Sequence, residues 1–247
     1  DRAHHLVTYI IIMKNEFAKA LLKNYKNKSN SNLTDAYIKK LLTKGTEILN
    51  VHQVDKSSFN TIQNEVKNVI KDVTFNLLPY DHKRFKQASN DFNDDPELQI
   101  SKTMEFTKNP WDDNIIIDKN MNYFNKFLFE RVEKYLNDNG IVPDMKPIIK
   151  NSWMTKSSKG KSLETHTHCK ACISGTYYYK TTKDSGNICF YSPKESPDLF
   201  EGKVEISPKD GMIVMFPGIL PHSVLENKSS EDRYGISFNI RIFKHDF

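Results

Sequence analysis

The chain has 247 residues, of which 38% are hydrophobic and 11% aromatic, so it can bury a real core and is not a wholly disordered protein. Its net charge of +5 comes from lysines spread along the chain, which permits an anionic partner such as nucleic acid without indicating one. Three cysteines do not make a disulfide framework, and a reducing, cytoplasmic location is expected. No apolar run approaches the roughly 18–20 residues of a membrane span, so no membrane partner is expected.

The first half of the chain is predicted to be helical. Residues 1–12 are expected to be an added leader before a natural start at Met13, followed by a helical N-terminal region over 13–105. In this region apolar residues step by three and four positions, which places them on one helix face. The pattern predicts helices over residues 17–25, 38–49 and 59–77.

A loop and a last helix are predicted to precede a β-rich domain, which we expect over 106–247. Residues 90–118 are punctuated by Asn, Asp and Pro and predict a connecting loop. A helix is expected over 121–136, ending near Asn139-Gly140. From Pro143 onward, short apolar runs alternate with turn signals, which is typical of a sandwich or barrel. The class predicted is therefore α+β, with helices buttressing a sheet.

The last predicted strand alternates strictly between polar and apolar residues from Arg233 to Ile242. The apolar face can pack against the helices, and the polar face can look into water or into a polar pocket. A second strand, Ile173–Tyr179, carries Ser174, Thr176 and Tyr178 on one side. Two such strands could line one cavity, and this is where chemistry is expected.

Three histidines are candidates for a metal site. His166 and His168 form an H-x-H pair, and two strand residues separated by one point to the same side. His222 lies far downstream, after Phe216-Pro217-Gly218. Iron(II) centres for oxygen chemistry use three protein ligands on one face and leave positions for a cosubstrate and O₂. An isolated H-x-H pair on the surface would mean nothing, so the downstream histidine decides the interpretation.

Arg233 follows His222 by 11 positions (233 − 222) on the polar face of the last strand. A 2-oxoglutarate molecule that chelates iron through its keto and C1 carboxylate groups leaves its second carboxylate in need of a cation. A planar guanidinium offers a bidentate match to that group. The alternative is that Arg233 forms an ordinary surface salt bridge.

The stretch from Trp153 to Asn239 resembles the 2-oxoglutarate–Fe(II) oxygenases of phage and bacterial genomes, within the prolyl-hydroxylase-like superfamily. The resemblance covers roughly the last 95 residues and rests on the motifs together. They are Trp153, Gly160, His166-Thr167-His168, Ser174-Gly175-Thr176-Tyr177-Tyr178, Ser185-Gly186, Pro193, Gly211 to Pro217, His222-Ser223-Val224, Arg233 and Ser237-Phe238-Asn239.

The resemblance implies a double-stranded β-helix, or jelly roll, with iron at one end of the barrel. His166, His168 and His222 would bind Fe(II), Arg233 would anchor 2-oxoglutarate, and Tyr178 would assist the same carboxylate. The implied reaction is hydroxylation of a C–H bond with O₂, giving succinate and CO₂. The substrate, an organic molecule or a protein, is not identified by the sequence, and the location would be the host cytoplasm if the protein is phage-encoded.

The sequence departs from the superfamily at two positions. The superfamily has H-x-D or H-x-E, whereas this chain has His168 in the carboxylate position, with Glu164 as an alternative source of a carboxylate. This change weakens iron binding and alters how the protein tunes the metal. Gly235 stands where a Ser often follows the arginine, and Ser237 or Asn239 is expected to take over that hydrogen bond.

Three other interpretations remain open. The domain could be a non-catalytic jelly-roll binding module that has lost iron competence, or a cupin-like dioxygenase that uses three histidines without 2-oxoglutarate. The segment Cys169-Lys170-Ala171-Cys172 could form part of a structural zinc site or, less readily, a redox pair. The simplest interpretation of these cysteines is that they are small, buried apolar residues.

Overall fold

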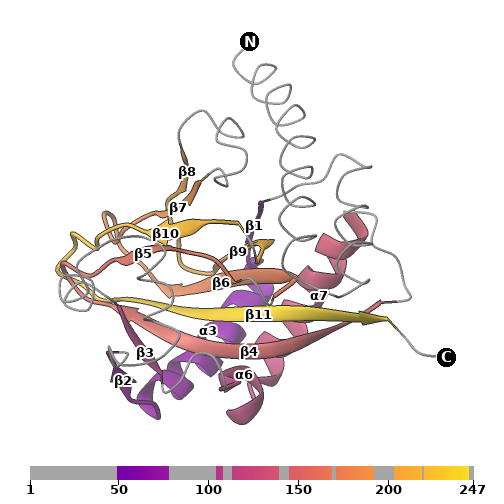
Figure 1. Cartoon of the computed structure of the whole chain (residues 1–247). Coiled ribbons are helices and arrows are strands. Elements are labelled where there is room, and N and C mark those ends of the chain that lie inside the picture. The colour runs from indigo at the N-terminus through magenta and orange to yellow at the C-terminus, as the bar shows by residue number, and fades with distance from the viewer. Residues whose placement is uncertain are drawn as a thin grey trace.

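The computed structural model describes residues 49–77, 104–107, 113–138, 145–168, 171–191, 203–218 and 220–244. Two antiparallel sheets face one another, and helices cover the outer face of the larger sheet (Figure 1). The predicted leader, the predicted helices over 17–25 and most of 38–49, and the Asn139-Gly140 helix end lie outside the described residues. No helix in the described segments is long and apolar enough to cross a membrane.

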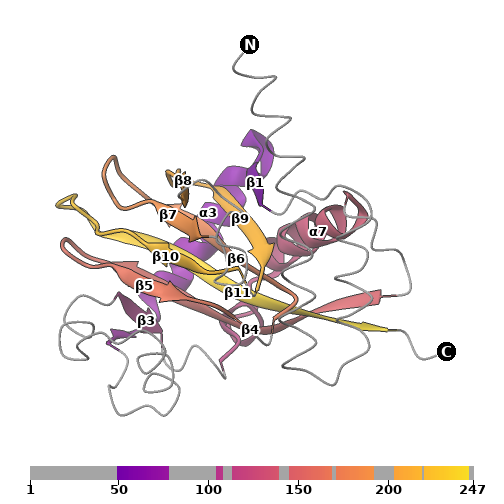
Figure 2. The ribbon, with the colours of Figure 1, turned by 45° about the horizontal axis from the view of Figure 1, so that its top comes forward.

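The larger sheet has seven strands, and β11 lies at its centre. In spatial order they are β1 (Asn50–Gln53), β9 (Met212–Pro217), β6 (Ile173–Lys180), β11 (Arg233–Lys244), β4 (Met145–Ser157), β3 (Glu105–Thr107) and β2 (Phe75–Asn76). The smaller sheet has four strands. In spatial order they are β5 (Leu163–His166), β10 (His222–Val224), β7 (Ile188–Tyr191) and β8 (Lys203–Ile206). Figure 2 shows the smaller sheet lying across one face of the larger one.

The register of β11 separates two kinds of side chain. Residues directly opposite in an antiparallel pair point to the same face, and Ser237 pairs with Trp153 of β4 and with Thr176 of β6. This face looks toward the smaller sheet. The neighbouring residue Phe238 points the other way and is fully buried in the main core, on the helix side. The predicted alternation along the last strand is therefore confirmed, and its polar face lines the space between the sheets.

Among the described residues, three helices cover the outer face: α3 (Lys56–Lys71), α6 (Ile115–Asp118) and α7 (Asn122–Asp138). The Asp55 side chain accepts hydrogen bonds from the backbone N–H groups of Ser57 and Ser58 and so caps the start of α3. Glu65 of α3 accepts bonds from two backbone N–H groups in the first turn of α7, at 3.1 and 2.7 Å. A carboxylate in that position satisfies unpaired donors and complements the helix dipole.

The main core joins the helices to the larger sheet. Phe124 of α7 contacts Tyr177 of β6 edge to face, with ring centroids 5.0 Å apart, and both side chains are fully buried. Ile62 and Val66 of α3 belong to the same core. The described part of the N-terminal half therefore shares its core with the barrel, while the boundary predicted at residues 105/106 stays a prediction.

Several predictions of secondary structure are confirmed, and others are wrong. The helix predicted over 121–136 is α7, and the helix predicted over 59–77 is α3 except at its end. That pattern overshoots because Asp72 ends the helix, and the apolar residues beyond it lead into β2. The segment 90–118 is not only a loop, since it contains β3 and α6, and β1 was not predicted. These strands are two to four residues long, too short for a periodic pattern, and are formed by pairing with distant strands.

We expect Phe124→Ala to destabilise the fold by about 3–5 kcal/mol, because it removes a fully buried ring from the contact between α7 and the sheet. Urea denaturation would measure this. The matched control is Tyr123→Ala on the same helix, where the side chain is 62% exposed and the expected change is within about 0.5 kcal/mol. Equal effects at the two positions would contradict the assigned orientation of α7.

Candidate metal centre

The three predicted histidines lie together between the sheets. His166 ends β5 and pairs directly with His222, the first residue of β10, while His168 follows two residues after β5. The ring centroids of His166 and His222 are 4.3 Å apart, and His168 lies 5.1 and 5.2 Å from them. The nitrogen atoms they can offer to a metal all lie within 4.8 Å of one another. In the described parts of the chain this is the one such group of His, Cys, Asp or Glu side chains.

His168 lies beyond the end of β5, not in the strand assumed in the H-x-H prediction. Its backbone carbonyl accepts a hydrogen bond from the Ala171 N–H at 2.8 Å, and its N–H donates to the Gly218 carbonyl at 2.5 Å. Gly218, after β9, approaches so closely that a Cβ there would lie 2.7 Å from the His168 carbonyl oxygen and 2.5 Å from that of Ala171. The Pro217-Gly218 signal thus marks a close backbone approach that places the third histidine.

Backbone carbonyls orient two of the imidazoles. The Nδ1–H of His166 donates to the Glu164 carbonyl, and the Nδ1–H of His222 donates to the Leu220 carbonyl, each at 2.8 Å. This fixes the tautomer and leaves Nε2 with its lone pair for a metal. Burial lowers the pKa of all three histidines, and for His168 and His222 well below 6.5. The cluster is therefore neutral at pH 7, which is the protonation state a metal requires.

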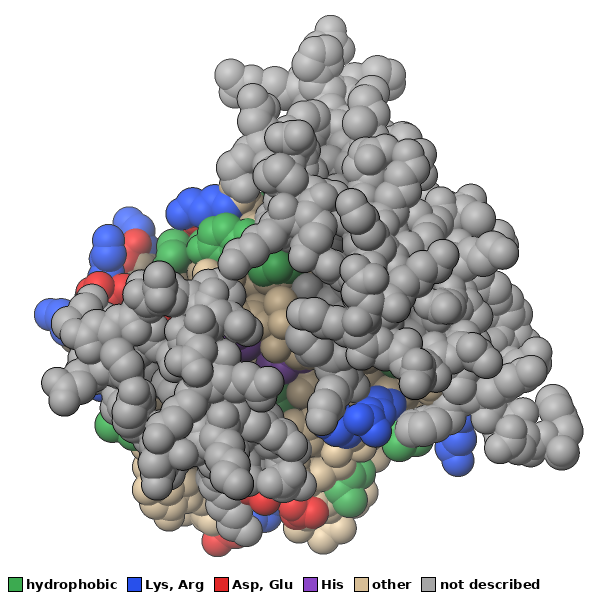
Figure 3. All heavy atoms as spheres, in the orientation of Figure 1, with side chains coloured by type: hydrophobic (Ala, Val, Ile, Leu, Met, Phe, Trp, Pro, Cys, Tyr) green, Lys and Arg blue, Asp and Glu red, His purple; other side chains and the backbone are tan. Residues whose placement is uncertain are grey.

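Aromatic side chains surround the histidines. Between ring centroids, Phe216 lies 4.6 Å and Phe190 6.0 Å from His222, and Trp153 lies 5.9 Å from His168. Figure 3 shows a patch of histidine surface on one side of the molecule. His166 and His168 are thus partly exposed, while aromatic groups surround the cluster.

Arg233 is buried, with 4% of its surface exposed, at the other end of the polar face. Its Nη1 donates to the carbonyls of Ser185 and Gly186 at 2.8 and 2.7 Å, and its Nη2 contacts the sulfur of Met104 at 3.0 Å. No Asp or Glu of the described segments forms an ion pair with it. Burying a guanidinium without an anion is costly, and burial lowers its pKa. The predicted alternative of a surface salt bridge is therefore wrong.

Tyr178 provides a second polar group beside Arg233. It pairs with Gly235, two residues along β11 from Arg233, and the two side chains are close enough that the positive charge opposes the rise in the tyrosine pKa. Burial nevertheless raises that pKa to about 12. The hydroxyl is buried and meets no hydrogen-bond partner among the described residues. A buried cation and an unsatisfied hydroxyl side by side make a site for a carboxylate.

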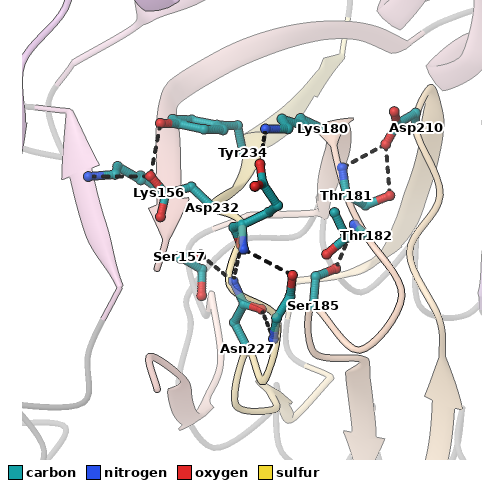
Figure 4. Close-up of polar contacts among 12 residues, drawn as sticks. Lys156, Ser157, Lys180, Thr181, Thr182, Ser185, Asp210, Asn227, Asp232 and Tyr234 are labelled. Carbon is teal, nitrogen blue, oxygen red and sulfur yellow. Dashed lines mark hydrogen bonds and ion pairs between the residues drawn. The ribbon is translucent and has the colours of Figure 1, made fainter. Parts of the chain in front are cut away.

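The loops around Arg233 are held by a buried asparagine. The Asn227 side-chain amide donates to the carbonyl of Ser157 (Figure 4) and to that of Glu231. Ser157 is the strand partner of Arg233. The Ser185–Gly186 turn that accepts from Arg233 is equally constrained. Gly186 has φ +88°, and a Cβ there would lie 2.1 Å from the Leu225 carbonyl oxygen. The guanidinium therefore has a fixed position.

Ser237 and Asn239 lie on the same face as Arg233 but farther along β11. Asn239 accepts a hydrogen bond from Ser174 at 2.6 Å and donates to Asn151 at 3.1 Å. Six residues of strand separate it from Arg233 by about 20 Å. Asn239 therefore belongs to a buried polar group about halfway along β11, and the expectation that Ser237 or Asn239 takes over the hydrogen bond of the missing serine stays a prediction.

Other sequence candidates lie apart from the cluster. Glu164 offers its backbone carbonyl to His166, but its side chain is exposed and outside the group that could hold a metal. Cys169 lies outside the described residues, and Cys172 and Cys189 are free. The contact of Met104 with Arg233 was missed, because Met104 lies in the segment predicted as a loop and no motif marks it.

The comparisons with known proteins agree with this geometry. Residues 151–239 match the family model described as "Putative 2OG-Fe(II) oxygenase". This segment contains all three histidines, Tyr178 and Arg233, so the barrel part of the chain is similar to a family of oxidoreductases whose cofactors are Fe(II) and 2-oxoglutarate. The resemblance inferred from the motifs is confirmed over this segment, while a phage origin stays a prediction. None of the curated proteins compared with the chain matches it.

Similar solved structures establish the fold. One is a prolyl hydroxylase from Trichoplax adhaerens, in complex with a peptide fragment of hypoxia inducible factor, with 13% identity, a TM-score of 0.53, and coverage of 84% of this chain and 88% of that one. Another is the non-heme alpha-ketoglutarate-dependent epimerase SnoN from nogalamycin biosynthesis, with 8% identity, a TM-score of 0.55, and coverage of 83% and 82%. The predicted α+β jelly roll is confirmed.

We expect the metal-free protein to lose stability as the pH falls below about 6.5. His222 is held neutral in the folded state and takes up a proton when the chain unfolds, so the unfolded state binds more protons in acid. The effect is up to about 1.4 kcal/mol per pH unit. Urea denaturation between pH 8 and 5.5 would measure it, and His222→Gln should flatten the slope. His52→Gln, at a less buried histidine, should keep most of the dependence of stability on pH. A flat wild-type profile would contradict the neutral cluster.

Proposed function

We propose that the protein is an Fe(II)- and 2-oxoglutarate-dependent dioxygenase that hydroxylates a C–H bond of an organic or protein substrate. The observation that carries the proposal is the arrangement along one buried face. Three neutral histidines converge at one end, and a buried arginine without a carboxylate partner in the described residues lies at the other. A metal ion would bind the histidines, and a dicarboxylate on that metal would supply the anion that Arg233 lacks.

His166, His168 and His222 fit an iron site in number and in chemistry. Three protein ligands leave the remaining positions of an octahedron for a cosubstrate and O₂. The carbonyls of Glu164 and Leu220 hold two of the rings with Nε2 toward the centre. Because His168 replaces the usual carboxylate, the ligand set is neutral, and we expect weaker metal binding than in members with H-x-D.

Arg233 and Tyr178 fit the far carboxylate of 2-oxoglutarate. The guanidinium supplies charge and the tyrosine hydroxyl supplies a further donor, and both are already desolvated. The carbonyls of Ser185 and Gly186 hold the guanidinium in place, so little reorganisation is needed on binding. A three-histidine dioxygenase without 2-oxoglutarate would have no use for this buried cation.

The chemistry divides between the cofactors and the protein. When bound, Fe(II) and 2-oxoglutarate supply O₂ activation, with succinate and CO₂ as coproducts and one oxygen atom inserted into the substrate. The side chains position these groups, and Phe190, Phe216 and Trp153 exclude water around the histidines. The partly exposed side of the histidines is the proposed entry for the substrate (Figure 3).

Anaerobic addition of Fe(II) and 2-oxoglutarate should give a weak visible charge-transfer band, and succinate should form when air is admitted. His222→Ala should abolish the band because it removes the most buried ligand of the three. His52→Ala, at a histidine outside the cluster, is the control and should keep it. A wild-type protein that gives neither band nor succinate would contradict the proposal and favour a non-catalytic binding module.

Arg233→Lys should raise the 2-oxoglutarate concentration needed for half of the maximal band by about tenfold or more. Lysine keeps the charge but loses the planar fork that donates to Ser185 and Gly186. Arg233→Met should raise the requirement further, and both variants should still bind the metal. A titration of the band against 2-oxoglutarate would measure this, and unchanged midpoints would exclude Arg233 as the anchor.

A further inference from the structure

A small apolar cluster connects the histidines to Arg233. It comprises Met104, Phe106, Trp153 and Val224, with Leu163 packed against it, and is separate from the main core. At one end, the ring centroids of Trp153 and His168 are 5.9 Å apart, and Val224 follows His222 by two residues on the same strand. At the other end, the sulfur of Met104 lies 3.0 Å from Nη2 of Arg233. An apolar wall thus runs between the two polar ends of the site.

This wall matches the middle of a dicarboxylic 2-oxo acid. Such a molecule has a chelating group at one end, a carboxylate at the other and only methylene groups between them. Methylene groups gain free energy when they leave water for an apolar surface. The cluster therefore offers the part of the cosubstrate that neither the histidines nor Arg233 can bind.

At the far end of this wall, the guanidinium of Arg233 is held in a fixed position. The two carbonyl bonds to Nη1 fix the guanidinium, and a Cβ on Gly186 would lie only 3.2 Å from that nitrogen. Met104 closes the adjacent side, with 3% of its surface exposed. Its backbone N–H donates to the Ser162 carbonyl at 3.2 Å, and the strand that follows it, β3, pairs with β4. A longer chain would meet both a fixed cation and a buried side chain whose backbone is held in place.

We propose that Met104 determines the chain length of the 2-oxo acid that this site accepts. The thioether side chain fills the space beside Nη2, so a five-carbon acid reaches the guanidinium and a six-carbon acid has no room for its extra methylene. This inference rests on the proposed function, since it assumes that a 2-oxo acid bridges the histidines and Arg233. It assigns a selective role to a residue of the segment before the barrel.

The test compares the binding of 2-oxoglutarate and 2-oxoadipate, which is one methylene longer, to the full chain loaded with Mn(II). Isothermal titration calorimetry gives both dissociation constants without turnover. One methylene in a tight apolar pocket is worth about 10- to 200-fold. We expect the wild-type protein to prefer 2-oxoglutarate at least about tenfold, and Met104→Ala to reduce this ratio by about tenfold, mainly through tighter binding of the longer acid.

Two matched variants show whether the side-chain volume at position 104, and not another effect of the substitution, causes the preference for the shorter acid. Met104→Leu keeps the size of the side chain and should keep the preference to within about threefold. Met121→Ala removes the same side-chain volume from the main core, away from this wall, and should also keep the preference. If Met104→Ala does not fold, Met104→Val opens part of the same space and should relax the preference in the same direction.

The outcomes distinguish this inference from the proposed function. If Met104→Ala, or Met104→Val in its place, keeps the wild-type ratio, Met104 is not the selector. If Met104→Leu loses the preference as fully as Met104→Ala, the sulfur contact and not the filled space is responsible, which also overturns the inference. If the Mn(II)-loaded wild-type protein binds neither acid, the proposed function fails together with it.

Discussion

The pairing of β11 with β4 on one side and β6 on the other is the constraint on which the rest of the structure depends. Successive side chains of β11 point to opposite faces of the sheet, so Phe238 packs in the helix-covered core and Ser237 faces the space between the sheets. A slip of one residue would exchange these faces, burying polar groups under the helices and pushing aromatic rings into the site. The same register that stabilises the fold therefore places Arg233 opposite the histidines.

The two ends of the inner face complement each other electrostatically. The histidines are held neutral by burial, so a divalent metal at that end is not opposed by protonated rings. Arg233 brings one buried positive charge without a described carboxylate to neutralise it. A dianionic cosubstrate would supply negative charge to both ends and recover the desolvation cost of the guanidinium. With His168 in place of a carboxylate, the three histidines would bring no negative charge to a metal, so the cosubstrate would matter more for metal retention.

The sequence predicted those parts of the fold and the site that rest on local periodicity or on motifs. The alternation from Arg233 onward, the helix over 121–136 and the convergence of His166 with His222 were all predictable. The position of His168 was not, because it depends on the close approach of the backbone at Gly218, after a distant strand. The roles of β3 and Met104 were also missed, since a three-residue strand has no periodic signal and its contacts come from distant pairing. Long-range contacts decided these features, and local sequence does not encode them.

The most direct test of the central claim is a crystal structure of the protein soaked with Mn(II) and 2-oxoglutarate. The account predicts one metal ion bound by His166, His168 and His222, with the far carboxylate of the cosubstrate on Arg233 and Tyr178. Metal bound elsewhere, or a cosubstrate whose carboxylate lies away from Arg233, would contradict it.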